Sequence, residues 1–367
     1  MGNWQYRDEG KRISKSVISD KSTEDLVEAK NFLNGLLDLR KSAKLTKTYI
    51  HGVKNAIAYN EHDKIYVDFR FDGTVTGRLS CAAYTAQEAM GVSFHTLPRE
   101  TTNNIRSLFK APRDWAFITA DYAAMELRVL SHIAKDGNMQ RAFNQGADLH
   151  TYTARLLFNK DNISKQERQI AKTVSFLIVY GGGAFNLSET VGISLSRAKK
   201  IIKDYENVYP GIFEYMEFVN KFIKENGYAY TIFGRKRNLP NVRSKDRKVV
   251  NQALRQGLNF TIQSAASDIL LTSLLGASDR FKEAGMQANF ESRPVATVHD
   301  SIEVVCPQEE VKDALTILYD EMVNYPKIKD IFNIHFDVPL AIDVEVGRSF
   351  GDGEAVEFLD GVPALVL

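Results

Sequence analysis

Two aspartates end apolar segments that lie far apart in the chain. Asp121 closes the segment WAFITAD and Asp300 closes RPVATVHD, so both are expected at strand ends. Two carboxylates in one place can hold a pair of Mg²⁺ ions, because Mg²⁺ prefers oxygen ligands and keeps positions for substrate phosphates. Ions about 3.5–4 Å apart would lower the pKa of an attacking hydroxyl and neutralise a leaving pyrophosphate. For each aspartate alone, a helix N-cap or a turn is the alternative role.

The segment between the two aspartates carries cations and aromatic rings at helical spacing. In RQIAKTVSFLIVYGGG, Arg168, Lys172, Phe176 and Tyr180 are four residues apart. At about 100° per residue they fall within an arc of about 120°. This order predicts a triphosphate end and a base-stacking end, whereas the alternative is an amphipathic helix with core aromatics and solvated cations. The chain has no GxxxxGK[ST] pattern, so an ATPase-type phosphate loop is not expected.

A polar stripe follows later in the chain. Arg255, Asn259 and Gln263 are spaced i, i+4, i+8 and share one face of a predicted helix. Such a stripe suits hydrogen bonds to base-edge acceptors in a minor groove, and Arg78 in TGRLS is a candidate for the same role. Buried structural hydrogen bonding is the alternative. Residues 235–255 carry eight Lys/Arg against one acid, which indicates either a face for phosphates or a solvated loop.

The composition is that of a globular protein. The chain has 367 residues, of which 44% are hydrophobic and 25% charged, and its length predicts two or three subdomains. No apolar run is long enough to span a membrane, and the polar N-terminus contains no secretory signal. Cys81 and Cys306 are the only cysteines, which favours buried thiols in a reducing cytosol over disulfides or a zinc site.

The order of predicted elements indicates an α+β fold, in which a helical insertion interrupts a sheet. Expected strands cover 64–70, 115–121 and 338–345, and a hairpin at 293–306 has His299–Asp300 at its tip. A helix is expected to begin near Ala123, and others cover 22–49, 247–282 and 308–323. Residues 136–233 are predicted to be almost wholly helical, with breaks at Gly181–Gly183, Gly192, Pro210 and Gly227.

Together these segments resemble family A DNA polymerases, the group of bacterial DNA polymerase I and its phage relatives, from about Leu36 to the C-terminus. DYAAMELRVLSHIA resembles motif A of the family, RQIAKTVSFLIVYGGG resembles motif B, and TVHDSIEV resembles motif C. TGRLS, FGRKRNLP, the R-x₃-N-x₃-Q stripe and G-x-D-x-H (Gly146, Asp148, His150) also match in order. Each pattern alone is weak, but seven in the right order are specific.

The resemblance implies a right-hand polymerase fold, with a mixed or antiparallel palm sheet and an inserted all-helical fingers subdomain. Residues 1–49 would be a helical remnant of a thumb or N-terminal extension, and 50–135 the first part of the palm with motif A. Residues 136–246 would form the fingers with motif B, and 247–367 the second part of the palm with motif C. The expected location is the cytoplasm of a bacterial or phage-infected cell.

The same resemblance implies template-directed addition of dNTPs to a primer 3′-hydroxyl, with pyrophosphate as the leaving group. In the family, two Mg²⁺ ions, for which Mn²⁺ can substitute, are bound by the equivalents of Asp121 and Asp300 and the carbonyl of Tyr122. Lys172 would be the general acid. The nucleotide-binding set would comprise Arg168, Lys172, Phe176, Tyr180, Glu126 and His150, in which Glu126 and Tyr180 crowd the 2′-carbon and reject ribonucleotides. The set that contacts primer-template DNA would comprise Arg78, Arg255, Asn259, Gln263 and His299.

Three positions depart from the family pattern. Ser301 stands where the family usually has Glu, so a carboxylate near the metals is missing, and we expect this to tune the rate without abolishing activity. Ala123 and Ala124 replace the usual Ser-Gln of motif A. SFHTLP at 93–98 replaces the familiar NLQNIP, which leaves the template contacts of that segment open.

About 35 residues precede the matching region, and they contain no Asp-x-Glu pair of exonuclease type. We therefore expect no proofreading and weak binding of duplex DNA. This is consistent with an excised polymerase domain, or with a split polymerase in which a separate polypeptide supplies the thumb or exonuclease. No membrane partner is expected.

Four other functions were weighed against DNA synthesis. Glu126 counts against a single-subunit RNA polymerase, and the motif B helix counts against a reverse transcriptase. A non-catalytic or partner-dependent DNA-binding subunit descended from a polymerase is the alternative from another class, suggested by Ser301 and the short N-terminus. A two-metal nuclease would leave the triphosphate-binding arc without a role.

Overall fold

The computed structural model describes residues 23–59, 64–83, 92–98, 104–288 and 291–364 of the chain. The chain forms two compact units: the first is Met1–Phe69 with Cys81–Leu97, and the second is Arg70–Ser80 with Pro98–Leu367. Residues 1–22, which belong to the predicted N-terminal extension, lie outside the described residues.

The first unit is mainly helical. The helix predicted over 22–49 is confirmed from Thr23: α2 (Thr23–Lys44) continues through a π-helical turn, η1 (Leu45–Ile50), into α3 (His51–Tyr59). The buried Tyr49 donates a hydrogen bond to the carbonyl of Thr96, the last residue of the short 3₁₀ helix η3 (Phe94–Thr96) in the same unit. The strand predicted over 64–70 is β1 (Val67–Arg70), which pairs with β2 (Ser80–Ala83) in a two-stranded sheet.

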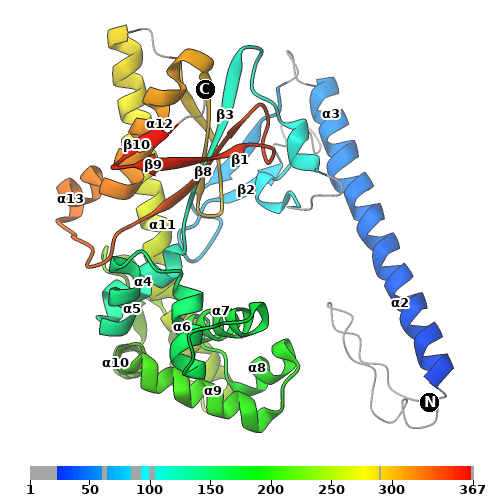
Figure 1. The fold of residues 1–367 in the computed structure, drawn as a ribbon, viewed down its shortest axis with the longest axis vertical. Helices are drawn as coiled ribbons and strands as arrows, with labels where there is room; N and C mark the ends of the chain where they lie inside the picture. Colours follow the sequence, from blue (N-terminus) through cyan, green and yellow to red (C-terminus); the bar gives the residue numbers. More distant parts are fainter. Residues whose placement is uncertain (1–22, 60–63, 84–91, 99–103, 289–290, 365–367) are drawn as a thin grey trace. The chain divides into compact units, whose positions relative to one another are not determined.

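The second unit contains a six-stranded sheet with the order β10-β9-β8-β3-β7-β6 (Figure 1). Every pairing in it is antiparallel. The predicted strand, hairpin and C-terminal strand are confirmed as β3 (Trp115–Tyr122), β6 (Arg293–Val298) with β7 (Ser301–Pro307), and β8 (Ile342–Gly347). The hairpin of β9 (Glu354–Leu359) and β10 (Val362–Ala364) was not predicted.

The two faces of this sheet differ because successive side chains of a strand point in opposite directions. Ala116, Ile118 and Ala120 of β3 are fully buried and belong to the main hydrophobic core. Thr119 and Asp121 alternate with them and therefore lie on the other face. Residues directly opposite each other on neighbouring strands share a face, so the pairing partners of Asp121, which are Ser301 on β7 and Asp343 on β8, lie on this second face too.

Helices follow β3 almost without interruption. They are α4 (Met125–Ala134), α5 (Gly137–Asn144), α6 (Leu149–Phe158), α7 (Lys165–Val179), α8 (Ala184–Val191), α9 (Leu195–Val208) and α10 (Pro210–Asn226). The predicted breaks at Gly192, Pro210 and Gly227 are confirmed as helix boundaries, and Gly192 and Gly227 have φ of 73° and 77°. The end of this stretch differs from the prediction, because β4 (Tyr228–Tyr230) and β5 (Lys236–Asn238) form a small hairpin there.

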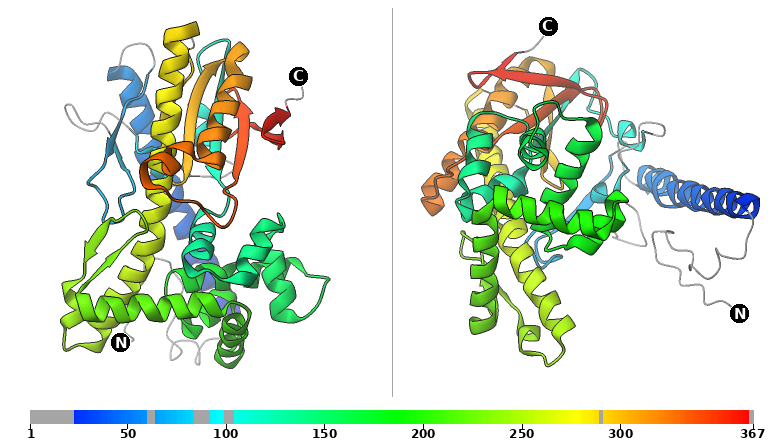
Figure 2. Two further views of the ribbon diagram at one scale, coloured as in Figure 1. Left: turned by 90° about the vertical axis from the view of Figure 1, so that its left-hand side faces the viewer. Right: turned by 60° about the horizontal axis from the view of Figure 1, so that its bottom comes forward.

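The long helix α11 (Arg247–Ala288) connects the helical region to the sheet. It has 42 residues and ends six residues beyond the predicted position 282. Figure 2 shows α11 beside the sheet at one end and beside α10 at the other. The segment predicted as one helix over 308–323 is three consecutive helical pieces: η6 (Gln308–Glu310), α12 (Val311–Tyr319) and the π-helical η7 (Asp320–Asn324), after which comes α13 (Pro326–Phe332).

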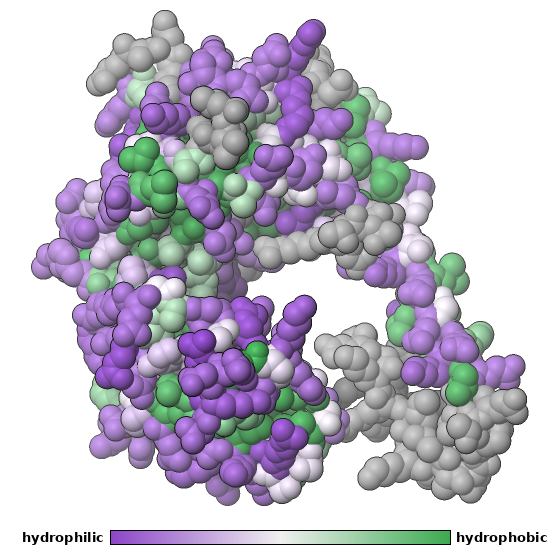
Figure 3. All heavy atoms as spheres, in the orientation of Figure 1, coloured by the Kyte–Doolittle hydropathy of each residue, from purple (hydrophilic) through white to green (hydrophobic). Residues whose placement is uncertain are grey.

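Hydrophilic side chains cover much of the face shown in Figure 3, with smaller apolar patches between them. Within the described residues, no helix combines the length and apolar character that crossing a bilayer requires. Cys306 is a buried free thiol, as predicted, whereas Cys81 is a free thiol that is only half-buried.

Asp136 provides a test of how the helical region is held together. It caps α5 by accepting from the backbone N–H groups of Asn138 and Met139, and it also accepts from Gly211 at the start of α10, while only 2% exposed. Asp136→Ala would leave these donors unpaired in the interior, so we expect it to lower the free energy of unfolding by about 2–3 kcal/mol.

Ser194→Ala serves as the matched control, because Ser194 caps α9 at an exposed position with one backbone bond. Its expected cost is about 1 kcal/mol or less. Urea unfolding followed by circular dichroism measures both variants. Equal losses would contradict the role of Asp136 as a link between α5 and α10.

Candidate functional site

A cleft of about 490 Å³ opens in the second unit where β3 and β7 meet α4 and α7. Apart from Ala124 and Met125, every residue that lines it was predicted from the sequence to be a site residue. These residues are Arg78, Asp121, Tyr122, Glu126, Phe176, Tyr180, His299 and Asp300. Four segments that are distant in the sequence therefore meet in one place.

The two aspartates lie at the ends of neighbouring strands. The backbone N–H of Tyr122 donates to the carbonyl of Asp300 over 3.1 Å, and Asp121 pairs in register with Ser301. The alternative in which Asp121 caps the following helix is wrong, since the N-cap of α4 is Ala124, with φ of 52° and no side-chain cap. Asp300 does lie in a two-residue turn, in which His299 has φ of 62°, a conformation that non-glycine residues seldom adopt.

Positive charge is already held at the acidic end of the cleft. The Nη2 of Arg78 lies 3.0 Å from Oδ1 of Asp300 and 3.0 Å from Oε1 of Glu126. Glu126 is only 6% exposed, and its other oxygen accepts from the hydroxyl of Tyr180 at 2.8 Å. Burial raises the pKa of Glu126. Burial and the adjacent Glu126 carboxylate also raise the pKa of Tyr180 to about 12, so the hydroxyl remains a donor at neutral pH.

The donor set at this end fits divalent cations that keep part of their coordination for substrate. Asp121 and Asp300 both line the cleft, and the guanidinium of Arg78 contacts Asp300. This end of the cleft therefore already accommodates one positively charged group. Among the residues that the structure describes, no three His, Cys, Asp or Glu side chains form a metal-binding group. Two carboxylates are enough for Mg²⁺, because it retains waters and binds substrate phosphates through its remaining positions.

The motif B segment is helical as predicted. Ser164 and Glu167 form a capping box at the start of α7, in which Glu167 reaches back to the backbone N–H of Ser164 at 3.0 Å. Phe176 and Tyr180 line the cleft, whereas Arg168 and Lys172 lie exposed on the preceding turns and do not line it. The arc of four residues therefore extends out of the cleft along one helix face.

Two further predicted residues lie beside these cations. Both nitrogens Nε and Nη2 of Arg168 donate to Asp148, at 2.8 and 2.9 Å, and this bidentate pair lowers the pKa of Asp148. The ring of His150 lies 5.9 Å from that of Phe176. Burial lowers the pKa of His150 to about 4, so it is neutral at pH 7, and its buried Nδ1 has no hydrogen-bond partner among the described residues.

The polar stripe of α11 approaches the same region from the other side. Gln263 lies beside the hydroxyl of Tyr180 and partly offsets the rise in its pKa, and Arg255 packs against Gly181. A Cβ at Gly181 would lie 2.8 Å from Cγ of Arg255, and the φ of this residue is +64°, so the position requires glycine. Asn259 is half-buried, with its Oδ1 unpartnered within the described part of the chain. None of the three stripe residues lines the cleft itself.

The basic segment 235–255 is only partly free for phosphates. Arg235 makes a bidentate pair with Asp268, with its Nη2 2.6 Å from Oδ1, and Lys236 lies over the ring of Tyr228 at 3.8 Å. Arg243, Lys245, Arg247, Lys248 and Arg255 are exposed. The alternative of a solvated loop therefore fits part of this segment, while its first residues are structural.

Sequence reasoning missed a buried carboxylate next to the site. Glu303 lies two residues after Ser301 on β7, on the same face as Asp121, and it is 0% exposed. Thr119 of β3 donates to its Oε2 at 2.6 Å, and Ser301 Oγ lies 2.6 Å from its Oε1. The available signal was an acid inside the apolar run SIEVV, where alternation places Glu303 and Ser301 on one face.

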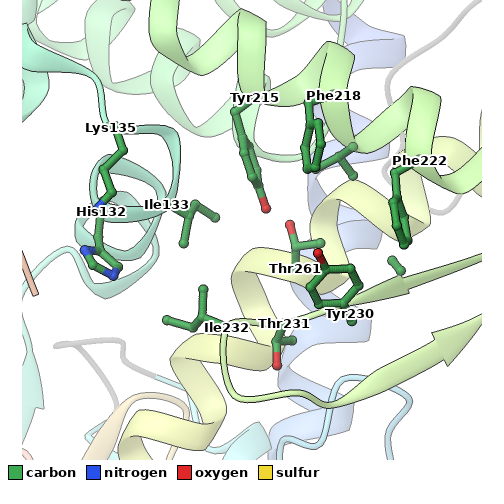
Figure 4. Close-up of a pocket in the computed structure, with 12 residues that line it drawn as sticks. His132, Ile133, Lys135, Tyr215, Phe218, Phe222, Tyr230, Thr231, Ile232 and Thr261 are labelled. Atoms are coloured by element: carbon green, nitrogen blue, oxygen red, sulfur yellow. The ribbon is translucent and has the colours of Figure 1, made fainter. Parts of the chain in front are cut away.

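A second pocket, of about 260 Å³, lies away from this cleft between α10, α11 and the segment that follows β4. Figure 4 shows aromatic side chains around it, with Tyr215, Phe218 and Phe222 from α10. None of the residues singled out from the sequence lines it.

Known proteins resemble this chain over most of its length, both in sequence and in structure. Residues 4–352 match the family model described as DNA polymerase family A. DNA polymerase I of Chloroflexus aurantiacus is 30% identical over 337 residues, which are 91% of this chain and 34% of that protein. DNA polymerase I of Bacillus caldotenax is 32% identical over 324 residues, which are 88% of this chain and 35% of that protein. The chain thus spans about a third of these relatives.

A solved structure agrees with the sequence comparison. The POL domain of Pol1 from M. smegmatis, in a complex with DNA primer-template and dNTP, superposes with a TM-score of 0.78 and 28% identity. The match covers 90% of this chain and 55% of that one. The predicted right-hand fold is therefore confirmed.

The buried Glu303 predicts a pH dependence of stability. Burial, with the charge of Asp121 adding to it, raises the pKa of Glu303 from 4.5 to about 7. Between these values the folded protein holds a proton that the unfolded chain releases, so the free energy of unfolding falls as the pH rises through this window. The loss is on the order of 3 kcal/mol at most.

Urea unfolding at pH 5 and pH 8 measures this effect. We expect Glu303→Gln to remove most of this pH dependence of the free energy of unfolding. Glu309→Gln, which changes an exposed acid, should keep it. A Glu303→Gln variant with the same pH dependence as the wild type would contradict the raised pKa.

Proposed function

Because the chain belongs to DNA polymerase family A, we propose that it is a DNA-directed DNA polymerase domain that adds dNTPs to a primer 3′-hydroxyl and releases pyrophosphate. The observation that supports this most directly is the meeting of Asp121 and Asp300 in one cleft with Phe176 and Tyr180. In this proposal 50–135 and 247–367 form the palm, 136–246 the fingers, and 1–49 the remnant of a thumb or N-terminal extension.

Asp121, Asp300 and the carbonyl of Tyr122 would hold two Mg²⁺ ions, or Mn²⁺ in their place. When bound, these ions supply an activated hydroxyl and neutralise the charge of the leaving pyrophosphate. Arg78 would exchange its contact with Asp300 for one with DNA or nucleotide as the ions bind, since a guanidinium and a metal compete for the same carboxylate oxygens.

Arg168, Lys172 and His150 would hold the triphosphate. Arg168 is already aligned by Asp148 through a fork of two hydrogen bonds, which directs the guanidinium before substrate arrives. Neutral His150 would donate or accept a hydrogen bond without adding charge. Lys172, exposed on the same face, would protonate the leaving pyrophosphate as general acid.

Glu126 and Tyr180 would select the sugar. Their hydrogen bond fixes both groups at the wall of the cleft, where a 2′-hydroxyl would meet them. Phe176 would lie against the sugar and base. Arg78, Arg255, Asn259, Gln263 and His299 would contact the primer-template. Primer-template DNA and dNTPs are therefore the proposed partners, with a separate polypeptide for the thumb or exonuclease as a further candidate.

Ser301 supports a second candidate function, a non-catalytic or partner-dependent DNA-binding subunit. This reading predicts that the chain binds primer-template but leaves the primer unextended with Mg²⁺ and all four dNTPs. The same assay with RNA templates and with rNTPs separates a reverse transcriptase and an RNA polymerase from a DNA polymerase.

Removal of either proposed metal ligand tests the catalytic assignment. We expect Asp121→Asn and Asp300→Asn each to lower the primer-extension rate by about 10³-fold or more, because each loses a charge that would bind the ions. Asp330→Asn, at an exposed position on α13, is the matched control and should extend as the wild type does. Single-turnover extension of a labelled primer measures the rates, and full activity of both site variants would contradict the proposal.

Lys172 can be tested against a neighbour on the same helix. Lys172→Ala should lower kcat by about 10²-fold, the usual contribution of a general acid. Lys165→Ala, at the first residue of the same helix, should change kcat less than about twofold. The pH profile of kcat provides a second readout, because the limb that reports the acid should be lost only in Lys172→Ala. Equal effects of the two substitutions would rule out a specific role for Lys172.

A further inference from the structure

Glu303 is a carboxylate that the proposed mechanism does not use, and it lies close to the place where one is missing. The family pattern has Glu where this chain has Ser301. Two residues later on the same strand and face, β7 carries Glu303 in a run that is otherwise apolar apart from Ser301. An ionisable group at 0% exposure carries a desolvation cost, so its retention calls for a physical explanation.

Glu303 cannot itself bind a cation in the cleft. Its side chain has no exposed surface, and it does not line the cleft that contains Asp121 and Asp300. Its two oxygens are instead occupied by protein hydroxyls: Oε2 by Thr119, and Oε1 by Ser301, both at 2.6 Å. Glu303 therefore acts through other residues.

These hydroxyls belong to the strands that carry the two aspartates. Thr119 is two residues before Asp121 on β3, and Ser301 directly follows Asp300 at the start of β7. The hydrogen bonds of Glu303 thus connect the two strands from side chain to side chain, in addition to the backbone pairing of Thr119 with Glu303.

The same network reaches the turn that holds Asp300. Ser301 Oγ lies 2.9 Å from the carbonyl of Val298 as well as 2.6 Å from Glu303. A serine hydroxyl has one hydrogen, so beside an ionised Glu303 it can donate only to Glu303 or to Val298. It satisfies both contacts together when a protonated Glu303 donates to it and it donates to Val298. In that arrangement Glu303 orients Ser301, and Ser301 closes the turn across His299, whose φ of 62° needs such support.

We propose that Glu303 is a positioning residue that, through Ser301 and Thr119, holds Asp121 and Asp300 in the geometry needed to share divalent cations. This inference rests on the proposed function and adds to it a positioning role for a residue that the family pattern does not include. Position 301 lacks the carboxylate of the family pattern. In this proposal the buried carboxyl group of Glu303 instead supports the metal ligands from the protein interior. Partners that orient metal ligands typically change metal affinity or activity by 10–100-fold when they are removed.

A purely structural role makes the opposite prediction. If Glu303 only filled space, an apolar residue of similar volume would serve as well or better, because replacement of a buried charged group by a well-packed hydrophobe is often stabilising. The two roles therefore separate in Glu303→Leu, which keeps volume but has no hydrogen bonds. Glu303→Gln keeps both hydrogen bonds, since its amide can donate to Ser301 and accept from Thr119.

The experiment measures Mn²⁺ binding to the full chain by electron paramagnetic resonance of the free ion. The protein is assembled with a dideoxy-terminated primer-template and the matching dNTP, and the double variant Asp121→Asn/Asp300→Asn gives the background of ions bound elsewhere. Extension kinetics on a normal primer and thermal unfolding are recorded for the same variants. Thr119→Val is included as a milder change that removes one hydrogen bond and retains shape.

We expect Glu303→Gln to bind Mn²⁺ within about twofold of the wild type and Glu303→Leu to bind about 10–100-fold more weakly, with Thr119→Val between them. In Glu303→Leu, kcat should fall while KM for dNTP changes little and the unfolding temperature is unchanged or higher. If Glu303→Leu does not fold, the contrast between Thr119→Val and Glu303→Gln decides the question in the same way.

Two results would overturn the inference. Wild-type Mn²⁺ affinity in both Glu303→Leu and Thr119→Val would show that the network has no effect on the metal site. Equal weakening in Glu303→Gln and Glu303→Leu would show that charge, and not hydrogen-bonded position, is what matters. Failure of the proposed function looks different: the wild type would then bind no more Mn²⁺ than the double aspartate variant and would not extend a primer.

Discussion

The structure depends on the pairing of β3 with β7. This pairing places Asp121 opposite Ser301 and lets the backbone of Tyr122 bond the carbonyl of Asp300. Antiparallel strands bring their opposite ends together, so the end of β3 and the start of β7 must meet at one edge. Two carboxylates at that edge repel each other, and the guanidinium of Arg78 against Asp300 compensates part of this repulsion in the protein alone. In the proposed function, bound metal ions would take the place of this guanidinium at Asp300.

Local sequence signals were sufficient for the parts of the fold that position the site. The apolar strand that ends on Asp121 and the hairpin around His299 and Asp300 each depend on neighbours in the sequence, and each is found where it was predicted. The same kind of signal was available for the unpredicted hairpin of β9 and β10, because Asp360–Gly361 is a two-residue turn with φ of 50° and 80° at its two positions.

Long-range contacts could not be obtained in the same way. The motif spacing indicated that Arg168 is a phosphate ligand, but only the fold shows that Asp148 already holds its guanidinium. Likewise, the sequence of β7 shows Glu303 as an acid in an apolar segment. Its hydrogen bond to Thr119, however, depends on the register between two strands, and its contact with Ser301 depends on how β7 folds. The single sequence also gave no reason for α10 and α5 to be joined through Asp136.

The central claim is that Asp121 and Asp300 jointly bind the divalent cations of the reaction. Its most direct test is anomalous X-ray diffraction from crystals of the chain with a dideoxy-terminated primer-template, the matching dNTP and Mn²⁺. The account predicts anomalous peaks within about 2.1–2.2 Å of carboxylate oxygens from both aspartates, adjacent to the phosphates of the nucleotide. A bound nucleotide with no metal peak between these two residues, or with peaks only at other carboxylates, would contradict it.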